Sequence, residues 1–96
     1  MSKDRLETAN QILRDAVATF LAREAGPQSL ITVTRAQFSS DFSHATVYLS
    51  VLPREKEVAA LGLATRTRDE LKDYLKKHTK LPRSPFIMFK MEPSLA

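Results

Sequence analysis

The residues with the clearest chemical potential are basic side chains in the last third of the sequence. Lys72, Lys76 and Lys80 recur at steps of four, so on a helix they would share one face. Cations at this spacing suit consecutive phosphates of a nucleic acid, an attraction that weakens as salt is raised. The pattern predicts an RNA-binding surface made of Arg66, Arg68, Lys72, Lys76, Lys77, Lys80 and Arg83, with Arg35 as an extension from an earlier segment.

The distribution of charge points to the same region. The chain has 15 Lys+Arg and 11 Asp+Glu residues, for a net charge of +4. Basic and acidic residues balance over positions 1–65, so the whole excess lies in residues 66–96. Such asymmetry is typical of proteins that bind a polyanion, most simply a nucleic acid. A solvated lysine-rich helix face is the alternative, and charge alone does not separate the two.

Catalytic and metal-binding patterns are missing from the sequence. His44 and His78 have no neighbouring residues at the spacing of a metal site or of a base and nucleophile. The only glycines are Gly26 and Gly62, so there is no glycine-rich phosphate loop. The absence of cysteine excludes disulfides, zinc fingers and iron–sulfur clusters. We therefore expect no catalytic residue, no metal site and no cofactor, and the protein is not predicted to be an enzyme.

The aromatic residues favour recognition of RNA shape over recognition of bases. Most of them fall in apolar patterns typical of a core, Phe86 and Phe89 among them. Tyr48, on the polar face of an alternating segment, is the only candidate for stacking on a base. Contacts to phosphates and to overall shape suit structured RNA.

Two helical regions are expected to position these side chains. Apolar residues at three- and four-residue steps predict an amphipathic helix from Ser2 to about Ala25, ended by Gly26-Pro27. A second helical region runs from about Arg54 to His78. It should kink or break between Thr65 and Glu70, where no apolar side chain is available to a core. Its expected inward positions are Val58, Leu61, Leu71, Tyr74, Leu75 and His78.

Three segments are predicted as strands. Leu30–Phe38 is rich in β-branched residues, and Ala45–Leu52 alternates between apolar and polar side chains. The polar turn between them makes an antiparallel hairpin, in which Ser39 and Asp41 take structural roles and Asp41 accepts hydrogen bonds from turn amides. A proline-bearing turn leads to a last strand, Phe86–Met91.

The resulting order is α-β-β-α-α-β, which indicates an α+β fold with a three-stranded sheet covered by helices. Ninety-six residues suit a single domain, with an ordered core of about residues 5–93. The order is compatible with the second topological type of KH domain, an RNA-binding fold. The sequence has no apolar run near the ~20 residues needed to span a bilayer and no visible secretory signal, so a cytoplasmic protein is expected.

The hairpin carries a resemblance to a known family. Ser39-Ser40-Asp41-Phe42 followed by Ala45-Thr46-Val47-Tyr48-Leu49-Ser50 resembles the turn and second strand of bacterial ribosome-binding factor A proteins, at the spacing of that family. The similarity extends upstream to the first helix and downstream to Leu75–Phe89, with its basic helix end, proline turn and last strand. It covers about residues 5–93.

This resemblance implies a fold and a function. The implied fold is a type II KH-like domain that lacks the Gly-any-any-Gly loop. Proteins of the family bind the immature small (30S) ribosomal subunit and assist late maturation of 16S rRNA, chiefly in the cold, and a GTPase commonly triggers their release. The resemblance therefore implies small-subunit RNA as partner, and nothing in the sequence suggests more than a monomer.

The sequence departs from the family pattern in two places. The family has Ala or Ser, any residue, then Gly at the kink between its last two helices, whereas the matching slot here is Thr67-Arg68-Asp69. Ala60-Leu61-Gly62 has the pattern but is expected inside the earlier helix. We therefore expect Thr67 to cap the break. The sequence also stops at Ala96, whereas many relatives continue into a longer tail.

Two other functions remain open from the residues alone. A protein–protein interaction module would use its lysines only for solubility, and its binding would be insensitive to salt, unlike phosphate contacts. A general KH-like RNA binder without preference for ribosomes is the third interpretation. The missing glycine loop and the scarcity of exposed aromatic residues argue against it.

Overall fold

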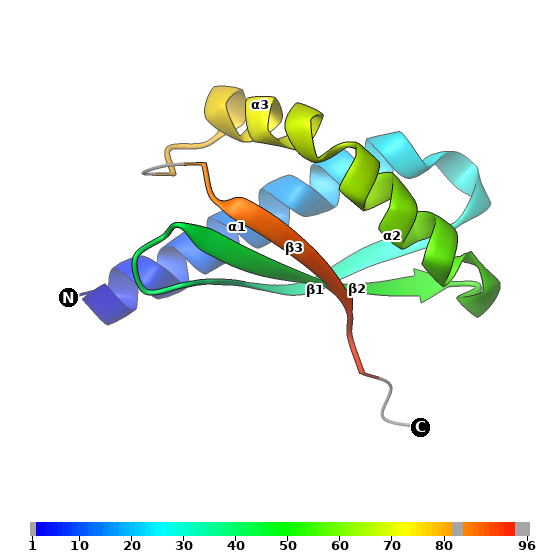
Figure 1. The fold of residues 1–96 in the computed structure, drawn as a ribbon, viewed down its shortest axis with the longest axis horizontal. Coiled ribbons are helices and arrows are strands. Elements are labelled where there is room, and N and C mark those ends of the chain that lie inside the picture. Colours follow the sequence, from blue (N-terminus) through cyan, green and yellow to red (C-terminus); the bar gives the residue numbers. More distant parts are fainter. Residues whose placement is uncertain (1, 82–83, 94–96) are drawn as a thin grey trace.

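The computed structural model describes residues 2–81 and 84–93, with side chains from Arg5 onward. The observed element order, α-β-β-α-α-β, confirms the prediction (Figure 1). The predicted contact residue Arg83 lies outside the described residues. The elements are α1 (Ser2–Ala25), β1 (Leu30–Phe38), β2 (His44–Leu52), α2 (Glu57–Arg66), α3 (Arg68–His78) and β3 (Phe86–Met91), with short 3-10 turns at Gly26–Gln28 and Arg54–Lys56.

The three strands form one sheet with β2 in the centre. β1 pairs with β2 in antiparallel fashion, as the predicted hairpin requires, from Leu30 opposite Leu52 to Phe38 opposite Ala45. β3 pairs with the other edge of β2 in parallel. A parallel neighbour needs a crossover connection, which α2 and α3 supply. The connection between β2 and β3 therefore allows the two strands to be parallel, and it contains all the predicted basic residues except Arg35.

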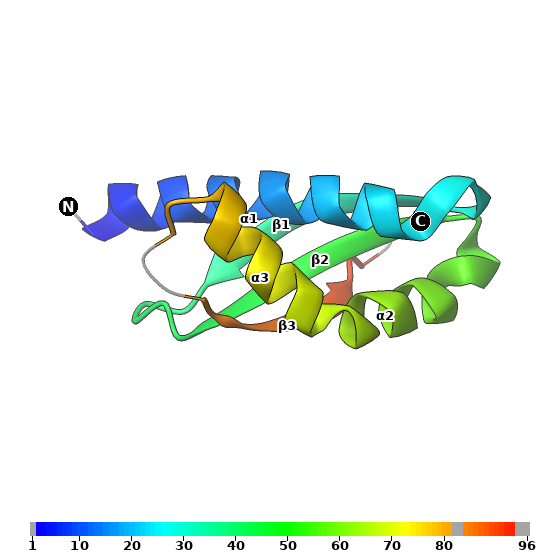
Figure 2. The ribbon, with the colours of Figure 1, turned by 90° about the horizontal axis from the view of Figure 1, so that it is seen from above.

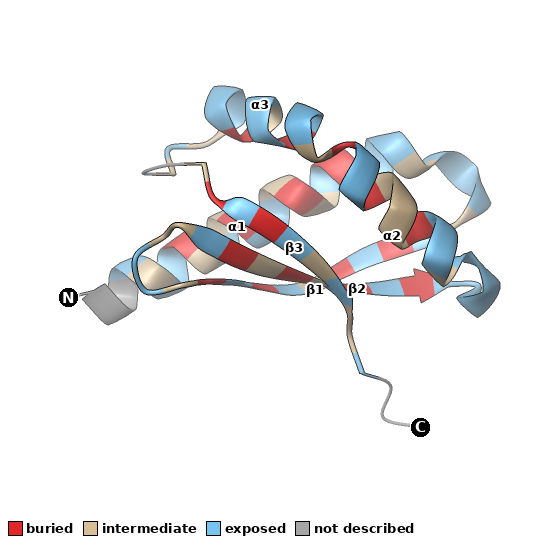
Figure 3. Cartoon of the chain, viewed as in Figure 1, coloured by how far each residue is buried: buried red, intermediate tan, exposed pale blue. Residues whose placement is uncertain are grey.

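All three helices lie on the same side of the sheet, as the two ribbon views show (Figures 1 and 2). Most strand residues that face the helices are buried, and those between them are exposed or only partly buried (Figure 3). The other face of the sheet is therefore open to solvent. The buried strand residues are Ile31, Val33, Ala36, Phe38, Ala45, Val47, Leu49, Val51 and Ile87.

The first helix contributes the largest apolar face to this core. Leu13, Val17 and Leu21 are almost completely buried, and Ala9 and Phe20 flank them. All but Leu21 belong to the apolar periodicity seen in the sequence. The side chain of Asn10 accepts a hydrogen bond from the backbone N–H of Phe38 at 2.8 Å. This bond holds the end of β1 against the helix.

The predicted break in the second helical region occurs at one residue. α2 ends at Arg66 and α3 begins at Arg68, with Thr67 buried between them. The Thr67 hydroxyl donates to the carbonyls of Leu63 and Ala64, at 2.8 and 3.3 Å. It therefore satisfies carbonyls at the end of α2, and no side-chain hydrogen bond caps the first amides of α3. Thr67 caps the break on the side of α2 only.

Two expected core positions of this region are wrong. Val58 is 82% exposed, because the buried residues of α2 are Ala60 and Ala64. A residue two positions before Ala60 lies on the far side of a helix with about 100° per residue. His78 is also exposed, and its ring lies against Tyr74 with 4.3 Å between ring centroids. Periodicity therefore misjudged the buried face of α2, whereas His78 shares the face of Leu71 and Leu75 and is exposed as the last residue of α3.

Candidate nucleic-acid interface

The basic residues of α3 divide between two flanks of the helix. Leu71 and Leu75 are buried against the rest of the protein. Arg68, Lys72 and Lys76 follow one another at four-residue steps, so they form a continuous stripe beside this buried face. We call these three residues the cationic flank. Arg68 is partly buried, whereas the two lysines are exposed.

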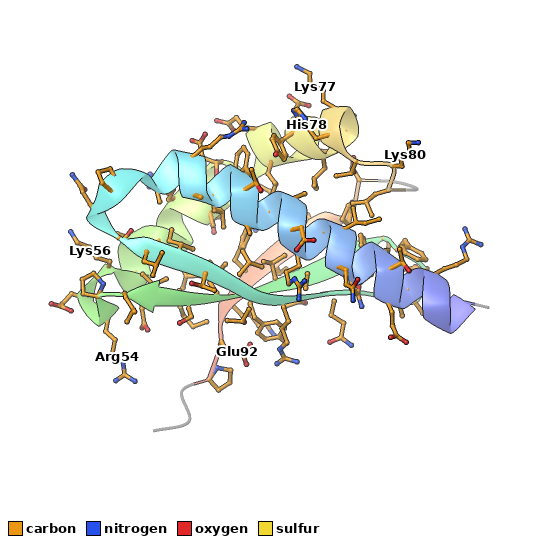
Figure 4. All side chains as sticks on the ribbon, turned by 180° about the vertical axis from the view of Figure 1, so that it is seen from behind. Arg54, Lys56, Lys77, His78, Lys80 and Glu92 are labelled. Carbon is orange, nitrogen blue, oxygen red and sulfur yellow. The ribbon has the colours of Figure 1, made fainter. Side chains whose placement is uncertain are left out.

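Lys77 belongs to the opposite flank. It follows Lys76 by about 100° around the helix and comes three residues after Tyr74. The Tyr74 ring faces α1, where it lies 5.5 Å from Phe20 between centroids and 5.8 Å from the Arg23 guanidinium carbon. Figure 4 shows Lys77 and Lys80 leaving the end of α3 in different directions. The structure thus separates Lys77 from the cationic flank.

Arg66 extends back along α2 and away from the kink. A Cβ atom built on Gly62 would lie 3.6 Å from its Nη1 atom, so the guanidinium covers this glycine. Arg66 is exposed and Lys80 is exposed just beyond the end of α3. Arg66 belongs to α2, and Lys80 lines a cavity together with Arg5 and Ile12 of α1, so neither cation continues the stripe of α3.

The cations between residues 66 and 80 have no acidic partner among the described residues. Ion pairs within the described part of the chain join Arg14 to Asp15 and Arg35 to Glu92. Asp73 lies four residues before Lys77 on the helix, yet no ion pair forms between them. The positive charge of this region is therefore available to an external anion.

Arg35 has a different environment on the open face of the sheet. Its Nε donates to Glu92 at 3.2 Å, and its guanidinium carbon lies 3.9 Å from the centroid of the Tyr48 ring. Thr34 also donates to Glu92, at 2.7 Å. The hydrogen bond from Thr34, followed by Arg35, lowers the pKa of Glu92 below its usual value. The structure does not bring Arg35 together with α3, and Arg35 covers the ring of Tyr48, the candidate for stacking on a base.

The hairpin turn is organised around Asp41. Its Oδ1 accepts hydrogen bonds from the Ser43 hydroxyl at 2.7 Å, the Ser43 backbone N–H at 3.0 Å and the Ser39 hydroxyl at 2.8 Å. These bonds, with Ser43 the main donor, hold the pKa of Asp41 far below its usual range. Phe42 adopts a left-handed backbone with φ of 63°, and its ring packs on Phe38. Asp41 thus compensates for an unfavourable turn conformation.

Phe86 is an aromatic residue that sequence reasoning assigned to the core and that the structure leaves 51% exposed. It begins β3, the edge strand, where no further strand covers it. The Arg68 guanidinium carbon lies 4.7 Å from the centroid of its ring, and the His44 ring meets it edge-on at 6.1 Å. Residues 86–89 are all apolar, so no alternation in the sequence marked Phe86 as exposed. In the structure Phe86 and Met88 lie on either side of buried Ile87 and point to the uncovered face.

A cavity of about 450 Å³ lies where the kink approaches the start of β3. Of the three predicted kink residues, Arg68 and Asp69 line it and Thr67 does not. No group of three or more metal-ligating side chains is found among the described residues. The complete lining is Ser43, Arg68, Asp69, Lys72, Ser84, Pro85, Phe86 and Ile87.

Together these features define a small basic α+β protein with a row of cations on α3 that form no ion pair among the described residues, the class expected to bind a polyanion. The helices in the described part of the chain are too short or too polar to cross a membrane. A family model described as ribosome-binding factor A matches residues 5–96. The chain belongs to the ribosome-binding factor A family.

Individual relatives agree with this assignment. The ribosome-binding factor A of Gemmatimonas aurantiaca is 31% identical over 97 residues, which cover 96% of this chain and 66% of that protein. The crystal structure of ribosome-binding factor A from Thermus thermophilus shares the fold, with a TM-score of 0.80 and 24% identity over 90% of this chain and 94% of that one. A second Thermus thermophilus model of the factor, fitted into a cryo-EM map of a 30S complex, is 28% identical with a TM-score of 0.71, and 85% of this chain matches 92% of that one.

Proposed function

We propose that this chain binds the small ribosomal subunit and assists late maturation of 16S rRNA. The family supports this function, as does the Thermus thermophilus relative that was fitted into a 30S complex. The protein would act by binding, as a monomer in the bacterial cytoplasm, and would leave the subunit with the help of a GTPase. It would change the conformation of RNA through binding energy and would not catalyse a reaction.

The observation that carries the proposal is the set of cations between residues 66 and 80 that form no ion pair within the described part of the chain. Phosphates attract such groups, and each contact releases counterions from the RNA. The cationic flank would contact phosphates most directly, and the exposed Arg66 and Lys80 would add contacts outside it. Lys77 would contribute less because it lies on the flank that faces α1. Arg35 would contribute least, since Glu92 already compensates its charge.

Co-sedimentation with ribosomal particles tests this proposal. Immature small subunits, mature small subunits and large subunits are incubated with the protein at low and moderate salt, then pelleted. We expect the protein to pellet with small subunits, immature ones above all, and to dissociate as salt is raised. Equal pelleting with all three particles would reduce the activity to nonspecific binding of polyanions.

A protein-binding module is the second candidate, because one end of the sheet exposes apolar side chains. Leu30 and Leu52 are cross-strand partners and are 62% and 58% exposed. If these leucines form the main docking surface, Leu52→Ser abolishes pelleting and salt has little effect. If added salt abolishes pelleting and Leu52→Ser leaves pelleting unchanged, the RNA interface is favoured.

A further inference from the structure

Another cavity lies at the end of the molecule where α1 begins. Its volume of about 370 Å³ falls within the roughly 300–1,000 Å³ of typical ligand sites. It is formed by the first part of α1, the turn between β1 and β2, and the segment that follows α3, which meet at one end of the molecule (Figures 1 and 2). We call it the α1 groove, and its lining is Arg5, Thr8, Ala9, Ile12, Phe42, Lys80 and Leu81.

The floor of the α1 groove is apolar. Ala9 is buried, whereas Ile12, Phe42 and Leu81 are only partly buried. Phe42 and Leu81 also pack against the hydrophobic core. Ile12 lines the groove without belonging to the core or to the partly buried residues that pack against it in the described part of the chain. An apolar group that entered the groove would therefore remove additional surface of Ile12 from water, which favours binding.

The hairpin turn fixes Phe42 in the wall of the groove. Phe42 has a φ of 63°, a left-handed conformation that is unfavourable for a bulky residue. The hydrogen bonds that Asp41 accepts from Ser39 and Ser43 maintain this turn. The Phe42 ring packs on the Phe38 ring, with 5.1 Å between centroids. This wall is therefore in place before a ligand binds, so little conformational entropy is lost there on binding.

The two cations of the groove give it a positive charge. Arg5 and Lys80 are exposed, and neither forms an ion pair among the described residues. None of the described residues that line the groove is acidic. Asp41 lies next to Phe42 in the sequence, but its Oδ1 already accepts hydrogen bonds from donors of its own turn. The groove thus complements a ligand that carries an apolar group beside anionic groups.

The apolar floor favours a peptide over RNA as this ligand. A nucleotide base is recognised by hydrogen bonds along its edges, yet Thr8 supplies the only uncharged polar side chain among the described lining residues. A large aliphatic side chain needs no such partner and would be buried against Ile12 and Leu81. Carboxylates next to it would form charge-assisted hydrogen bonds with the cations of the rim.

We propose that the α1 groove docks a short acidic segment of a partner protein. One apolar side chain of the segment lies against Ile12 and Leu81, and carboxylates on either side of it pair with Arg5 and Lys80. This inference goes beyond the proposed function and does not rest on it, because the groove is separate from the cationic flank of α3. Lys80 is also among the cations proposed to contact RNA, so the tests use substitutions on α1.

Selection from a peptide library tests the docking site. The full-length protein is panned against short random peptides displayed on phage, and phage that also bind the Ile12→Gln protein are removed. We expect the enriched peptides to share a large apolar residue flanked by Asp or Glu. Failure to enrich any peptide, or enrichment of peptides without acidic residues, would overturn the inference.

An enriched peptide carrying a fluorescent label then provides the energetic test. Ile12→Gln removes the apolar contact and Arg5→Glu reverses a charge of the rim, so each should lower affinity for the peptide about tenfold. Val58→Gln is the control for the first variant, because Val58 is an apolar helix residue that is 82% exposed and does not line the groove. Arg14→Glu is the control for the second, with the same change of charge at an exposed position of α1 outside the groove. Equal losses in the controls would refute the site.

The remaining outcomes separate docking of a peptide from binding of RNA and from the proposed function. If oligouridine displaces the peptide and itself binds Ile12→Gln more weakly than the wild type, the groove is an RNA site and peptide docking is refuted. If the peptide binds with the expected losses but no ribosomal particle pellets the protein, docking stands and the proposed function is refuted. If the protein pellets with small subunits but no peptide distinguishes the wild type from Ile12→Gln, the proposed function stands and docking is refuted.

Discussion

The cationic flank of α3 and the open face of the sheet both present arginine beside an aromatic ring, yet their electrostatics differ. On the open face, Arg35 stacks on Tyr48 and pairs with Glu92, which Thr34 also holds. On α3, Arg68 stacks on Phe86 and no acidic group pairs with it among the described residues. A carboxylate of the protein compensates the charge of Arg35, whereas the charge of Arg68 has no such partner within the described part of the chain.

This contrast shows that a basic residue becomes a binding residue through what surrounds it. Glu92 comes 57 residues after Arg35 in the sequence and reaches it only because β3 ends beside the strands of the hairpin. The cations of α3 have acidic residues nearby in sequence, Asp69 and Asp73, that form no ion pair with them. Proximity in sequence therefore does not predict which of these basic side chains is paired with a carboxylate.

The largest expected effect tests whether the region around α3 is the interface at all. The triple variant Lys76→Glu, Lys77→Glu, Lys80→Glu reverses three exposed charges and should weaken binding to small subunits by about 100-fold or more. All three side chains are exposed, so circular dichroism and thermal unfolding should remain close to the wild type. Affinity is measured by pelleting at fixed salt.

The matched control for this variant is Lys56→Glu, at the other end of the molecule (Figure 4). Lys56 is also exposed, and its reversal should reduce affinity only through the change in net charge. The triple variant changes the net charge three times as much as Lys56→Glu does. A loss of log affinity in Lys56→Glu that is about one third of the loss in the triple variant would therefore mean that the total charge matters and that α3 is not the docking surface.

The second prediction separates the two flanks of α3. Neutralising Lys72 and Lys76 together (both to Gln) should lower affinity about tenfold and reduce the slope of log affinity against log salt by about 1.5. Lys77→Gln should lower affinity by less than about twofold, because its side chain lies on the flank that faces α1. A salt series for each variant measures both quantities. Comparable losses would show that the RNA wraps around the end of the helix.

The fold could largely be predicted from the sequence, because the patterns that specify its helices and strands are local. Alternation in residues 45–52 and β-branched residues in 30–38 specify the hairpin, and the absence of apolar residues near Thr67 marks the helix break. The parallel pairing of β3 and the exposure of Val58 were not accessible, since both depend on how the helices lie across the sheet. Crossover geometry is a property of tertiary packing and leaves no periodicity.

Of the candidate site, the sequence predicted only which basic residues could contribute, and not how they are arranged. Four-residue spacing grouped Lys72 with Lys76, and the structure adds Arg68 to the same stripe. The ion pair of Arg35 with Glu92 could not be predicted, because it joins β1 to the residue after β3, far away in the sequence. The exposed ring of Phe86 was missed because an apolar strand in sequence says nothing about whether it will lie at the edge of a sheet.

The third prediction addresses the paired arginine directly. Arg35→Gln should change affinity for small subunits by less than about 1.5-fold, while Glu92→Gln, which frees the Arg35 charge, should raise it by up to about twofold. Pelleting at low salt gives the best sensitivity for effects of this size. A large loss with Arg35→Gln would place the open face of the sheet in the interface.

The smallest expected effect is the pH dependence of stability. It tests whether Glu92 pairs with Arg35 in solution as it does in the structure. Thr34 and Arg35 lower the pKa of Glu92 in the folded protein below the value of about 4.3 found in an unfolded chain. The ionised carboxylate therefore favours folding at all pH values above that unfolded pKa. This contribution is lost as the pH falls through the lower folded pKa, where Glu92 takes up a proton.

Thermal unfolding of the wild type and of Glu92→Gln from pH 7 to pH 3 checks this sign. The wild type should have the higher Tm above about pH 5, and the difference should shrink as the pH falls below the ordinary carboxyl pKa. Thr34→Val removes the main hydrogen bond to the carboxylate and should raise the pKa of Glu92 in an NMR titration. A Tm difference that is constant over the whole pH range would mean that Glu92 does not hold Arg35, and the charge of Arg35 would then be as available to RNA as that of the cationic flank.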